Sequence, residues 1–475
     1  MFSFREHRAE SMRKGLWNKL KFILMLALLV SVLCACVPGN TTATEDSDAN
    51  TSTTQAPETT ESGTEEPTTE EPTTEAEKEL YRVNEGSPLE GIPYYDYDTY
   101  KGYWNMEKGA EMLLFTAKSS DGYTQYLTDL TDAGFSLYAE NEIVGNLYST
   151  WTKDELIVTM MHMPNLGSTR IVAEPLSNGL ATLESENTYT DAGYENLIIQ
   201  IGSPEEYNNG MCYVYRLCDG SFIVVDMGQK NQKLVDNIYE LLEKYAPDPD
   251  NIVIAAFFVT HAHGDHYGGF ETFTYNYRDN VTIEKIVYNY HNEKSFEYSD
   301  ETDPSCLYIV EELAELYDGV ELIEAHPGQE FFIRDARIEI LYTWEMFSSD
   351  IIPYLNNSCI VFSVTLENTK IMQLGDCGPQ ASPILVDVYG NYLDSDFIQV
   401  AHHGNIGANA ELNRIINPEV ILYPANWYNY DRFYETDRNA PFRDAEHVYV
   451  AGGKATVIPL PFDSSKVEVW DIYPN

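Results

Sequence analysis

The sequence is poor in basic residues and has no serine-nucleophile motif. It holds 29 Lys and Arg against 76 Asp and Glu, which gives a formal net charge of −47. Nucleic-acid affinity rests mainly on Lys and Arg that neutralise phosphates, so this composition disfavours a DNA or RNA partner. A simpler interpretation is that the acidity keeps an exported chain soluble. No Gly-x-Ser-x-Gly segment occurs, which argues against hydrolysis by a serine at a strand-to-helix turn.

Cysteine is also scarce, with seven residues in a chain of 475. Five of them follow the N-terminal region, and an odd number leaves at least one free thiol or an intermolecular bond. Cys212 and Cys218 lie in an extended stretch, where a six-residue separation spans roughly 20 Å, too far for a bridge. We therefore expect no disulfide framework, and we expect these cysteines to pack as small apolar residues. The five are Cys212, Cys218, Cys306, Cys359 and Cys377.

One long apolar run stands near the N-terminus, where residues 22–33 follow a basic region. Because the run is short for a membrane-spanning helix, it predicts an export signal over residues 1–36. It ends in Leu33-Cys34-Ala35-Cys36, which resembles a bacterial lipobox with Cys36 as the lipidated residue. The alternatives are an ordinary cleaved signal or a short membrane anchor. A lipidated Cys36 would anchor the protein in the membrane, on the extracellular face of a bacterial cell.

Two regions separate the signal from the main domain. Residues 37–79 repeat Glu-Pro-Thr-Thr-Glu without apolar periodicity, which predicts a disordered tether. Residues 80–190 predict a small α+β module, with a helix over residues 123–133 and strands over 135–139, 156–161 and 170–173. This module shows no catalytic constellation, and its lone His162 is interpreted as structural. Its role is open between substrate selection, cell-wall contact and packing against the next domain.

Residues 196–475 predict an α/β layered domain. Two strand-like runs flank the turn at Asp219-Gly220, which is a hairpin signal. A helix is expected over residues 230–245, where apolar residues recur at helical spacing, and a fully buried strand over residues 252–259. Buried strands and helices continue to alternate to the end of the chain, as a layered α/β fold requires.

The most informative segment follows that buried strand. Three histidines and an aspartate lie within six residues, in Thr260-His261-Ala262-His263-Gly264-Asp265-His266. Imidazole and carboxylate are ligands that suit zinc, and also manganese or iron. Four polar side chains at an apolar strand end would carry uncompensated desolvation without a cation. The segment therefore predicts a metal site, with His261 and His263 on one ion and Asp265 and His266 on another.

This His-x-His-x-Asp-His pattern resembles the signature of the metallo-β-lactamase superfamily, and three further segments of that family follow the expected order. The resemblance implies that Asp226, in Val225-Asp226-Met227-Gly228, supports the site from behind the ligands. It implies that Asp376, which ends a later strand, bridges two ions. It also implies a ligand in His402-His403-Gly404. We prefer His402 as that ligand, because it ends the strand, and this leaves His403 to contact substrate.

Within the superfamily, the run from Asn356-Asn357-Ser358 to His402-His403-Gly404 is similar to the extracytoplasmic domain of the DNA-uptake protein ComEC. It is also similar to a streptococcal phosphocholine esterase. Many family members supply another histidine between the first cluster and the bridging aspartate. Here that region offers only His291 and His326, neither in a recognisable motif, and Asn357 occupies the place typical of this branch.

The resemblance implies an αββα sandwich over residues 196–475 and a dinuclear metal-dependent hydrolase. Two divalent ions, zinc or else manganese, would lower the pKa of a shared water and so provide a hydroxide, with Asp265 or Asp376 as proton acceptor. The expected enzyme is a monomeric phosphodiesterase or esterase that acts on a small-molecule or cell-surface substrate. The alternatives are a lactonase or β-lactamase, and a binding protein that keeps the fold without turnover.

Overall fold

The computed structural model describes residues 85–204, 210–298, 304–352 and 354–473. The predicted signal, the lipobox with Cys36 and the predicted tether lie outside these residues. Within the described part of the chain, no helix is both long and apolar enough to cross a membrane. Cys212, Cys218, Cys359 and Cys377 are buried and form no disulfide, as we expect from the sequence.

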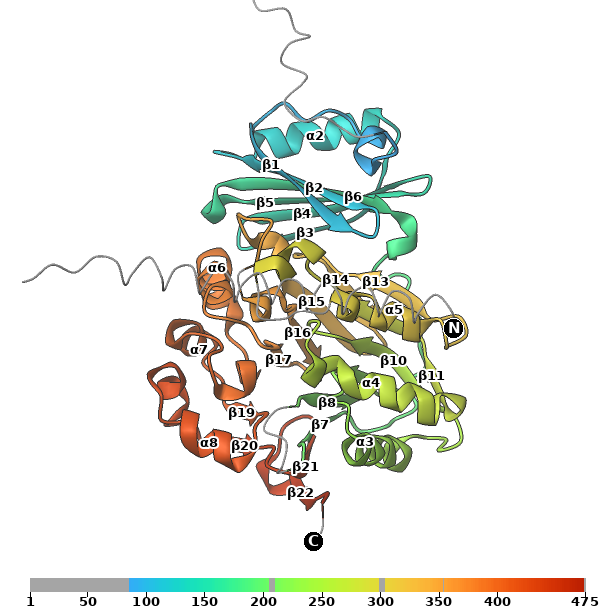
Figure 1. The fold of residues 1–475 in the computed structure, drawn as a ribbon, viewed down its shortest axis with the longest axis vertical. Helices are drawn as coiled ribbons and strands as arrows, with labels where there is room; N and C mark the ends of the chain where they lie inside the picture. The colour runs from blue at the N-terminus through green and yellow to red at the C-terminus, as the bar shows by residue number, and fades with distance from the viewer. Residues whose placement is uncertain (1–84, 205–209, 299–303, 353, 474–475) are drawn as a thin grey trace, which may run out of the picture. The chain divides into compact units, whose positions relative to one another are not determined.

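The first sheet has six antiparallel strands in the order β1-β2-β6-β5-β4-β3, and helix α2 (Asp121–Asp132) covers one of its faces (Figure 1). Tyr126 and Leu130 of α2 are buried in a common core with Phe115 and Val158 of the sheet. The structure adds β1, β2 and β4 to the predicted strands. The strands are β1 (Thr99–Glu107), β2 (Ala110–Thr116), β3 (Ser136–Ile143), β4 (Asn146–Lys153), β5 (Leu156–Met163) and β6 (Ser168–Pro175).

The second sheet has nine strands in the order β13-β12-β10-β9-β8-β7-β21-β22, with β11 beside β10. The strands from β9 to β13 run parallel, and the others antiparallel. Its strands are β7 (Leu197–Ile201), β8 (Cys212–Arg216), β9 (Phe222–Val225), β10 (Ile252–Phe258), β11 (Val281–Ile283), β12 (Lys285–Tyr288), β13 (Glu321–Glu324), β21 (Lys454–Pro459) and β22 (Glu468–Asp471).

The third sheet has seven strands in the order β14-β15-β16-β17-β18-β19-β20, and the strands from β17 to β20 run parallel. Its strands are β14 (Glu330–Ile333), β15 (Ala336–Tyr342), β16 (Val361–Leu366), β17 (Thr369–Gln373), β18 (Phe397–Gln399), β19 (Val420–Tyr423) and β20 (His447–Val450).

These two larger sheets pack face to face and are covered by helices on their outer faces. Ile223 and Phe258 of one sheet share a buried core with Phe362 and Ile371 of the other. Helices of the first outer layer are α3 (Gln232–Tyr245), α4 (Gly264–Tyr277) and α5 (Ile309–Ala314). Those associated with the other sheet are α6 (Ala381–Tyr389), α7 (Ala410–Ile416) and α8 (Trp427–Phe433). The predicted αββα sandwich is thereby confirmed (Figure 1).

The six-stranded sheet contacts the sandwich through apolar and charged groups. Trp104 of β1 stacks on Trp344, with ring centroids 5.9 Å apart and an interplanar angle of 14°. His326 lies between two carboxylates: Nε2 is 2.8 Å from Glu174 of β6, and Nδ1 is 2.8 Å from Glu345. All three of these side chains are buried. We call His326, Glu174, Glu345 and the adjacent buried Glu324 the histidine–glutamate cluster.

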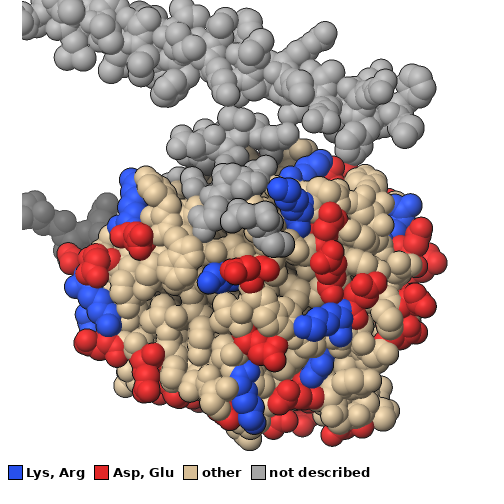
Figure 2. Space-filling view, turned by 90° about the horizontal axis from the view of Figure 1, so that it is seen from below, with Lys and Arg blue, Asp and Glu red and all other residues tan. Residues whose placement is uncertain are grey.

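Figure 2 shows the charged side chains on one face of the protein. On the face drawn in Figure 2, Asp and Glu side chains alternate with fewer Lys and Arg, and no continuous basic patch forms on that face.

Candidate metal centre

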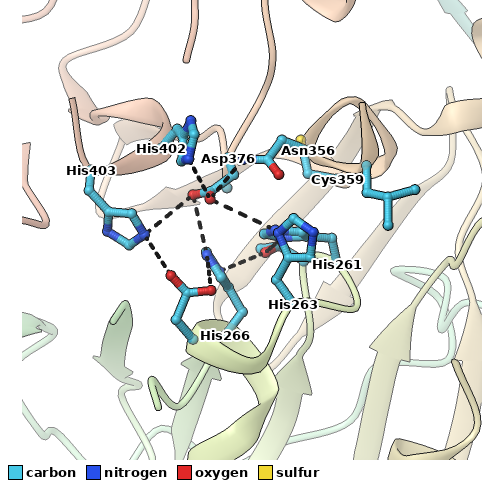
Figure 3. A network of polar contacts seen from close by, with 12 residues as sticks. His261, His263, His266, Asn356, Cys359, Asp376, His402 and His403 are labelled. Atoms are coloured by element: carbon cyan, nitrogen blue, oxygen red, sulfur yellow. Dashed lines mark hydrogen bonds and ion pairs between the residues drawn. The ribbon is translucent and has the colours of Figure 1, made fainter. Parts of the chain in front are cut away.

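Four strand ends bring the predicted site residues together. Asp226 follows β9, His261 and His263 follow β10, Asp376 follows β17, and the His402-His403 pair follows β18. The carboxyl ends of neighbouring parallel strands meet at one edge of a sheet, and the facing of the two sheets joins their edges. Figure 3 shows Asp376 between His261 and His263 on one side and His403 on the other.

The first ligand group consists of His261, His263 and Asp376. His261 Nε2 is 3.0 Å from His263 Nδ1 and 3.8 Å from Asp376 Oδ2. His263 is the residue before α4, which begins at Gly264, so the two histidines sit on a short segment between a strand and a helix. Three protein ligands with an open position are typical of a catalytic zinc site.

The second ligand group consists of Asp265, His266 and His403, next to the other oxygen of Asp376. His266 Nε2 is 3.3 Å from Asp376 Oδ1, and His403 Nε2 is 3.8 Å from the same atom. His403 Nε2 also lies 3.4 Å from Asp265 Oδ2. One oxygen of Asp376 therefore faces each group, which is the arrangement that a bridging carboxylate requires.

Three buried atoms at this centre have no hydrogen-bond partner among the described residues: His266 Nε2, His403 Nε2 and Asp376 Oδ1. A buried polar atom without a partner costs about 1–3 kcal/mol. All three converge on the second group, where a cation would satisfy them together. The donor set thus fits divalent metal ions, and nitrogen and carboxylate ligands suit zinc or manganese.

Asp226 supports this centre from behind, as the resemblance implies. Its Oδ1 accepts a hydrogen bond from the Thr260 backbone amide at 2.8 Å, and its Oδ2 lies 2.7 Å from His266 Nδ1. This contact fixes a hydrogen on Nδ1 of His266 and leaves Nε2 to face the ligand group. Asp226 holds a left-handed backbone conformation with φ of 54°, which turns the chain back under the site directly after β9.

The charges of the site shift several pKa values. Burial lowers the pKa of His266, but Asp376 and Asp226 outweigh it and raise that pKa well above its ordinary value. Burial raises the pKa of Asp376, but His266, His402 and His403 hold it well below its usual range. For His261, burial and the neighbouring His266 and His263 lower the pKa well below its usual value. A cation that binds His266 displaces a proton, so metal binding is expected to release protons.

The structure places His402 and His403 beside different oxygens of Asp376, and it groups His403, rather than the His402 that we prefer from the sequence, with other ligand residues. His403 belongs to the second ligand group, and its Nδ1 donates to the Pro424 carbonyl at 2.7 Å. His402 belongs to neither group: its Nε2 is 3.8 Å from Asp376 Oδ2, and its side chain is 15% exposed. Both residues adopt left-handed backbone conformations, with φ of 51° and 53°. Two such residues in a row turn the second histidine inward, which strand periodicity does not predict.

We expect different losses from the two adjacent histidines. His403→Ala should weaken the binding of one ion by more than about 100-fold. This exceeds the loss of about 10–100-fold that follows when a residue that only supports a ligand is removed. His402→Ala should keep both ions and lower kcat by about 10²–10⁴-fold, the range for loss of a proton donor. Metal titration and steady-state kinetics on both variants would separate these outcomes. The opposite pattern would restore His402 as the ligand.

A second difference concerns the two asparagines. The resemblance points to Asn357, but it is Asn356 Nδ2 that donates to Asp376 Oδ2, at 3.2 Å. The Asn357 side chain instead accepts from the backbone amides of Gln380 and Ala381, at 3.2 and 3.0 Å, where α6 begins. Asn356 therefore orients the bridging carboxylate, and Asn357 holds the adjoining helix in place.

The two histidines without a motif have different surroundings. Both ring nitrogens of His326 are taken up by Glu174 and Glu345, so His326 has no lone pair for an ion. His291 belongs to neither ligand group. Its Nδ1 donates to the Asn292 carbonyl at 2.9 Å, and burial, together with His263, lowers its pKa to about 4.

Comparison with known proteins gives one family. Residues 208–425 match the family model described as "Metallo-beta-lactamase superfamily", and these residues contain every member of both ligand groups. A search of curated proteins finds no matching relative.

Several solved structures are similar to part of the chain at low sequence identity. YhfI, a metallo-beta-lactamase fold protein from Bacillus subtilis, is 13% identical over 55% of this chain and 98% of its own, with a TM-score of 0.33. CmlA, a diiron beta-hydroxylase from Streptomyces venezuelae, is 11% identical over 56% of this chain and 54% of its own, with a TM-score of 0.34. A putative Zn-dependent hydrolase from Thermotoga maritima is 15% identical over 54% and 96%, with a TM-score of 0.26.

The αββα sandwich, the two facing ligand groups and the family match agree with one another. Residues 208–425 form a metallo-beta-lactamase superfamily domain.

Proposed function

We propose that this protein is a metal-dependent hydrolase, a phosphodiesterase or related esterase that acts on an extracellular substrate. The observation that carries the proposal is the placement of Asp376, which belongs to the first ligand group and also faces the second, with unsatisfied buried atoms around it. Two divalent ions held there would lower the pKa of a water molecule and polarise the substrate's phosphoryl or carbonyl oxygen. The choice of a phosphodiester rests on the similarity of the Asn356-Asn357-Ser358 and His402-His403-Gly404 segments to the ComEC branch.

Two residues of the chain are placed to transfer protons during the reaction. His402 is partly exposed, and its Nδ1 lies 3.3 Å from the Tyr354 hydroxyl. Its Nε2 lies 3.8 Å from Asp376 Oδ2, at the metal centre, where it would donate a hydrogen bond or proton to a substrate oxygen. The side chain of Asp265 is 20% exposed and that of Asp376 is 2% exposed. Asp265 is therefore the carboxylate that can exchange a proton with solvent after the reaction.

The proposal is tested with chromogenic substrates. Full-length protein reconstituted with zinc or manganese should hydrolyse a bis-nitrophenyl phosphodiester faster than a phosphomonoester, a lactone or a nitrocefin-type cephalosporin. Preferred turnover of the lactone or cephalosporin would favour a lactonase or β-lactamase instead. Stoichiometric metal without turnover of any of them would favour a binding protein that retains the fold.

We also propose that the protein is anchored in the bacterial cell membrane through a lipid on Cys36, facing outward. The support is the sequence Leu33-Cys34-Ala35-Cys36 directly after the apolar run. Radiolabelled fatty acid should enter the wild-type protein, and the Cys36→Ser variant should remain unlabelled. Cys34→Ser is the matched control and should label like the wild type. Equal labelling of wild type and Cys36→Ser would contradict the anchor.

A further inference from the structure

His291 lies outside both ligand groups but is held in the same way as the ligands His266 and His403. All three side chains are almost fully buried. In each, Nδ1 is engaged by a neighbouring oxygen, and a buried Nε2 has no hydrogen-bond partner. A carbonyl oxygen can only accept, so His291 Nδ1 carries its hydrogen and Nε2 carries a lone pair. This shared pattern indicates that Nε2 of His291 can accept a hydrogen bond or bind a cation.

The strand register places this side chain beside the first ligand group. β12 runs parallel to β10, with Phe258 paired to Val287 and the Val259 amide bonded to the Val287 carbonyl at 3.0 Å. The segments that follow β10 and β12 leave the sheet at the same edge. The segment after β10 continues to His263, and the segment after β12 continues to His291. His263 and His291 therefore both follow the carboxyl ends of two neighbouring parallel strands, on the same side of the sheet.

The chemistry of His263 complements that lone pair. His263 faces His261 through Nδ1, and an imidazole that binds a cation through Nδ1 carries its hydrogen on Nε2. Ligating histidines generally donate this other N–H to a nearby acceptor, which fixes the ring and raises its basicity. A neutral imidazole with its lone pair on Nε2 is such an acceptor.

We propose that His291 is a positioning residue for the first ligand group: its Nε2 accepts a hydrogen bond from His263 Nε2 when His263 Nδ1 binds the ion. This inference rests on the proposed metal-dependent function. It assigns His291 a place behind His263 equivalent to that of Asp226 behind His266.

The test compares two substitutions of similar size in the full-length protein. His291→Gln keeps an acceptor oxygen, and His291→Met offers only a weak one. Metal affinities are measured by zinc titration against a chromophoric chelator, and the number of imidazoles per ion by X-ray absorption. His162→Met is the matched control, because His162 is a buried histidine in the six-stranded sheet with Nδ1 bonded to Thr169 at 3.0 Å.

We expect His291→Met to weaken one of the two ions by about 10–100-fold with an unchanged imidazole count. His291→Gln should recover most of this loss, and His162→Met should bind both ions like the wild type. Unfolding temperatures of the metal-free proteins check that each variant is folded. Wild-type affinity of His291→Met for both ions would overturn the inference, as would loss of one imidazole, which would make His291 a ligand. A wild type that binds no second ion would instead refute the proposed function itself.

Discussion

Asp376→Ala should remove metal binding at both positions and abolish turnover. The carboxylate contributes one oxygen to each ligand group and is buried between His266, His402 and His403. Without it, two cations would face each other across a cavity with no negative charge between them. A metal ion contributes several kcal/mol of transition-state stabilisation, so we expect kcat to fall by about 10³-fold or more. Metal analysis after reconstitution and kinetics on the preferred chromogenic substrate would measure both effects.

The matched control for this variant is Asp376→Asn, which keeps the size of the side chain and the contact with Asn356 but loses the charge. If charge is what holds the ions, both variants lose them. An Asp376→Asn protein that keeps two ions would show that shape is sufficient. An Asp376→Ala protein with two ions and near-normal turnover would contradict the bridging role.

The second large effect concerns stability. Removing one partner of a buried charge network leaves the others uncompensated, and His326→Leu should therefore lower the free energy of unfolding by about 3–5 kcal/mol. Glu174 and Glu345 would lose the imidazole that lies 2.8 Å from each. His162→Leu, which removes the hydrogen bond of a buried histidine to Thr169, should cost about 1–2 kcal/mol. Urea unfolding of the two variants gives the comparison, and equal losses would contradict a special role for the cluster.

The same cluster should make stability depend on pH. Burial, with Glu174 and Glu345, raises the pKa of Glu324 from 4.5 to about 8, against Lys108 and His326. Burial lowers the pKa of His326, but Glu345 and Glu174 outweigh it and raise that pKa well above 6.5. Both groups hold protons more tightly in the folded state. Their contribution is therefore complete at acid pH and falls as pH rises, between about 4.5 and 8 for Glu324.

Unfolding measured at pH 5.5 and pH 8.5 should show this fall in the wild type. Glu324→Gln cannot lose the proton, so the difference between the two pH values should shrink in that variant. Other carboxylates of this acidic chain titrate equally in both proteins and cancel in the comparison. An identical pH difference in wild type and variant would show that Glu324 is not the group responsible.

How much could be predicted from the sequence depended on how far apart the relevant residues lie. His261, His263, Asp265 and His266 occupy six consecutive positions after an apolar strand, so their pattern alone indicates a metal site. The alternation of buried strands and amphipathic helices also follows from local signals, because both are recognised within short windows. The αββα order of the layers came from the family resemblance. The strands β1, β2 and β4 were not predicted, since their burial depends on the partners that they meet across the sheet.

Other features depended on backbone conformation or on distant contacts. Two consecutive left-handed residues decide whether His402 or His403 faces the ligands, and no spacing rule signals them. A shift of one position likewise separates Asn356 from Asn357, because neighbouring side chains point in different directions. The contact of His326 with Glu174 joins residues 152 positions apart, so the sequence offered His326 as a possible ligand when its nitrogens are already used.

The packing of Trp104 on Trp344 and the contact of Glu174 with His326 determine which fragments of this protein can be expressed and which substitutions it tolerates. A fragment cut after the six-stranded sheet would expose the Trp344 face and leave His326 with one carboxylate partner of two. Such a fragment would tend to aggregate, since a large newly exposed apolar surface is an aggregation hazard. We therefore expect the segment from β1 to β6 to be expressed best together with the αββα sandwich, and a substitution on one side of their shared boundary to need a compatible residue on the other.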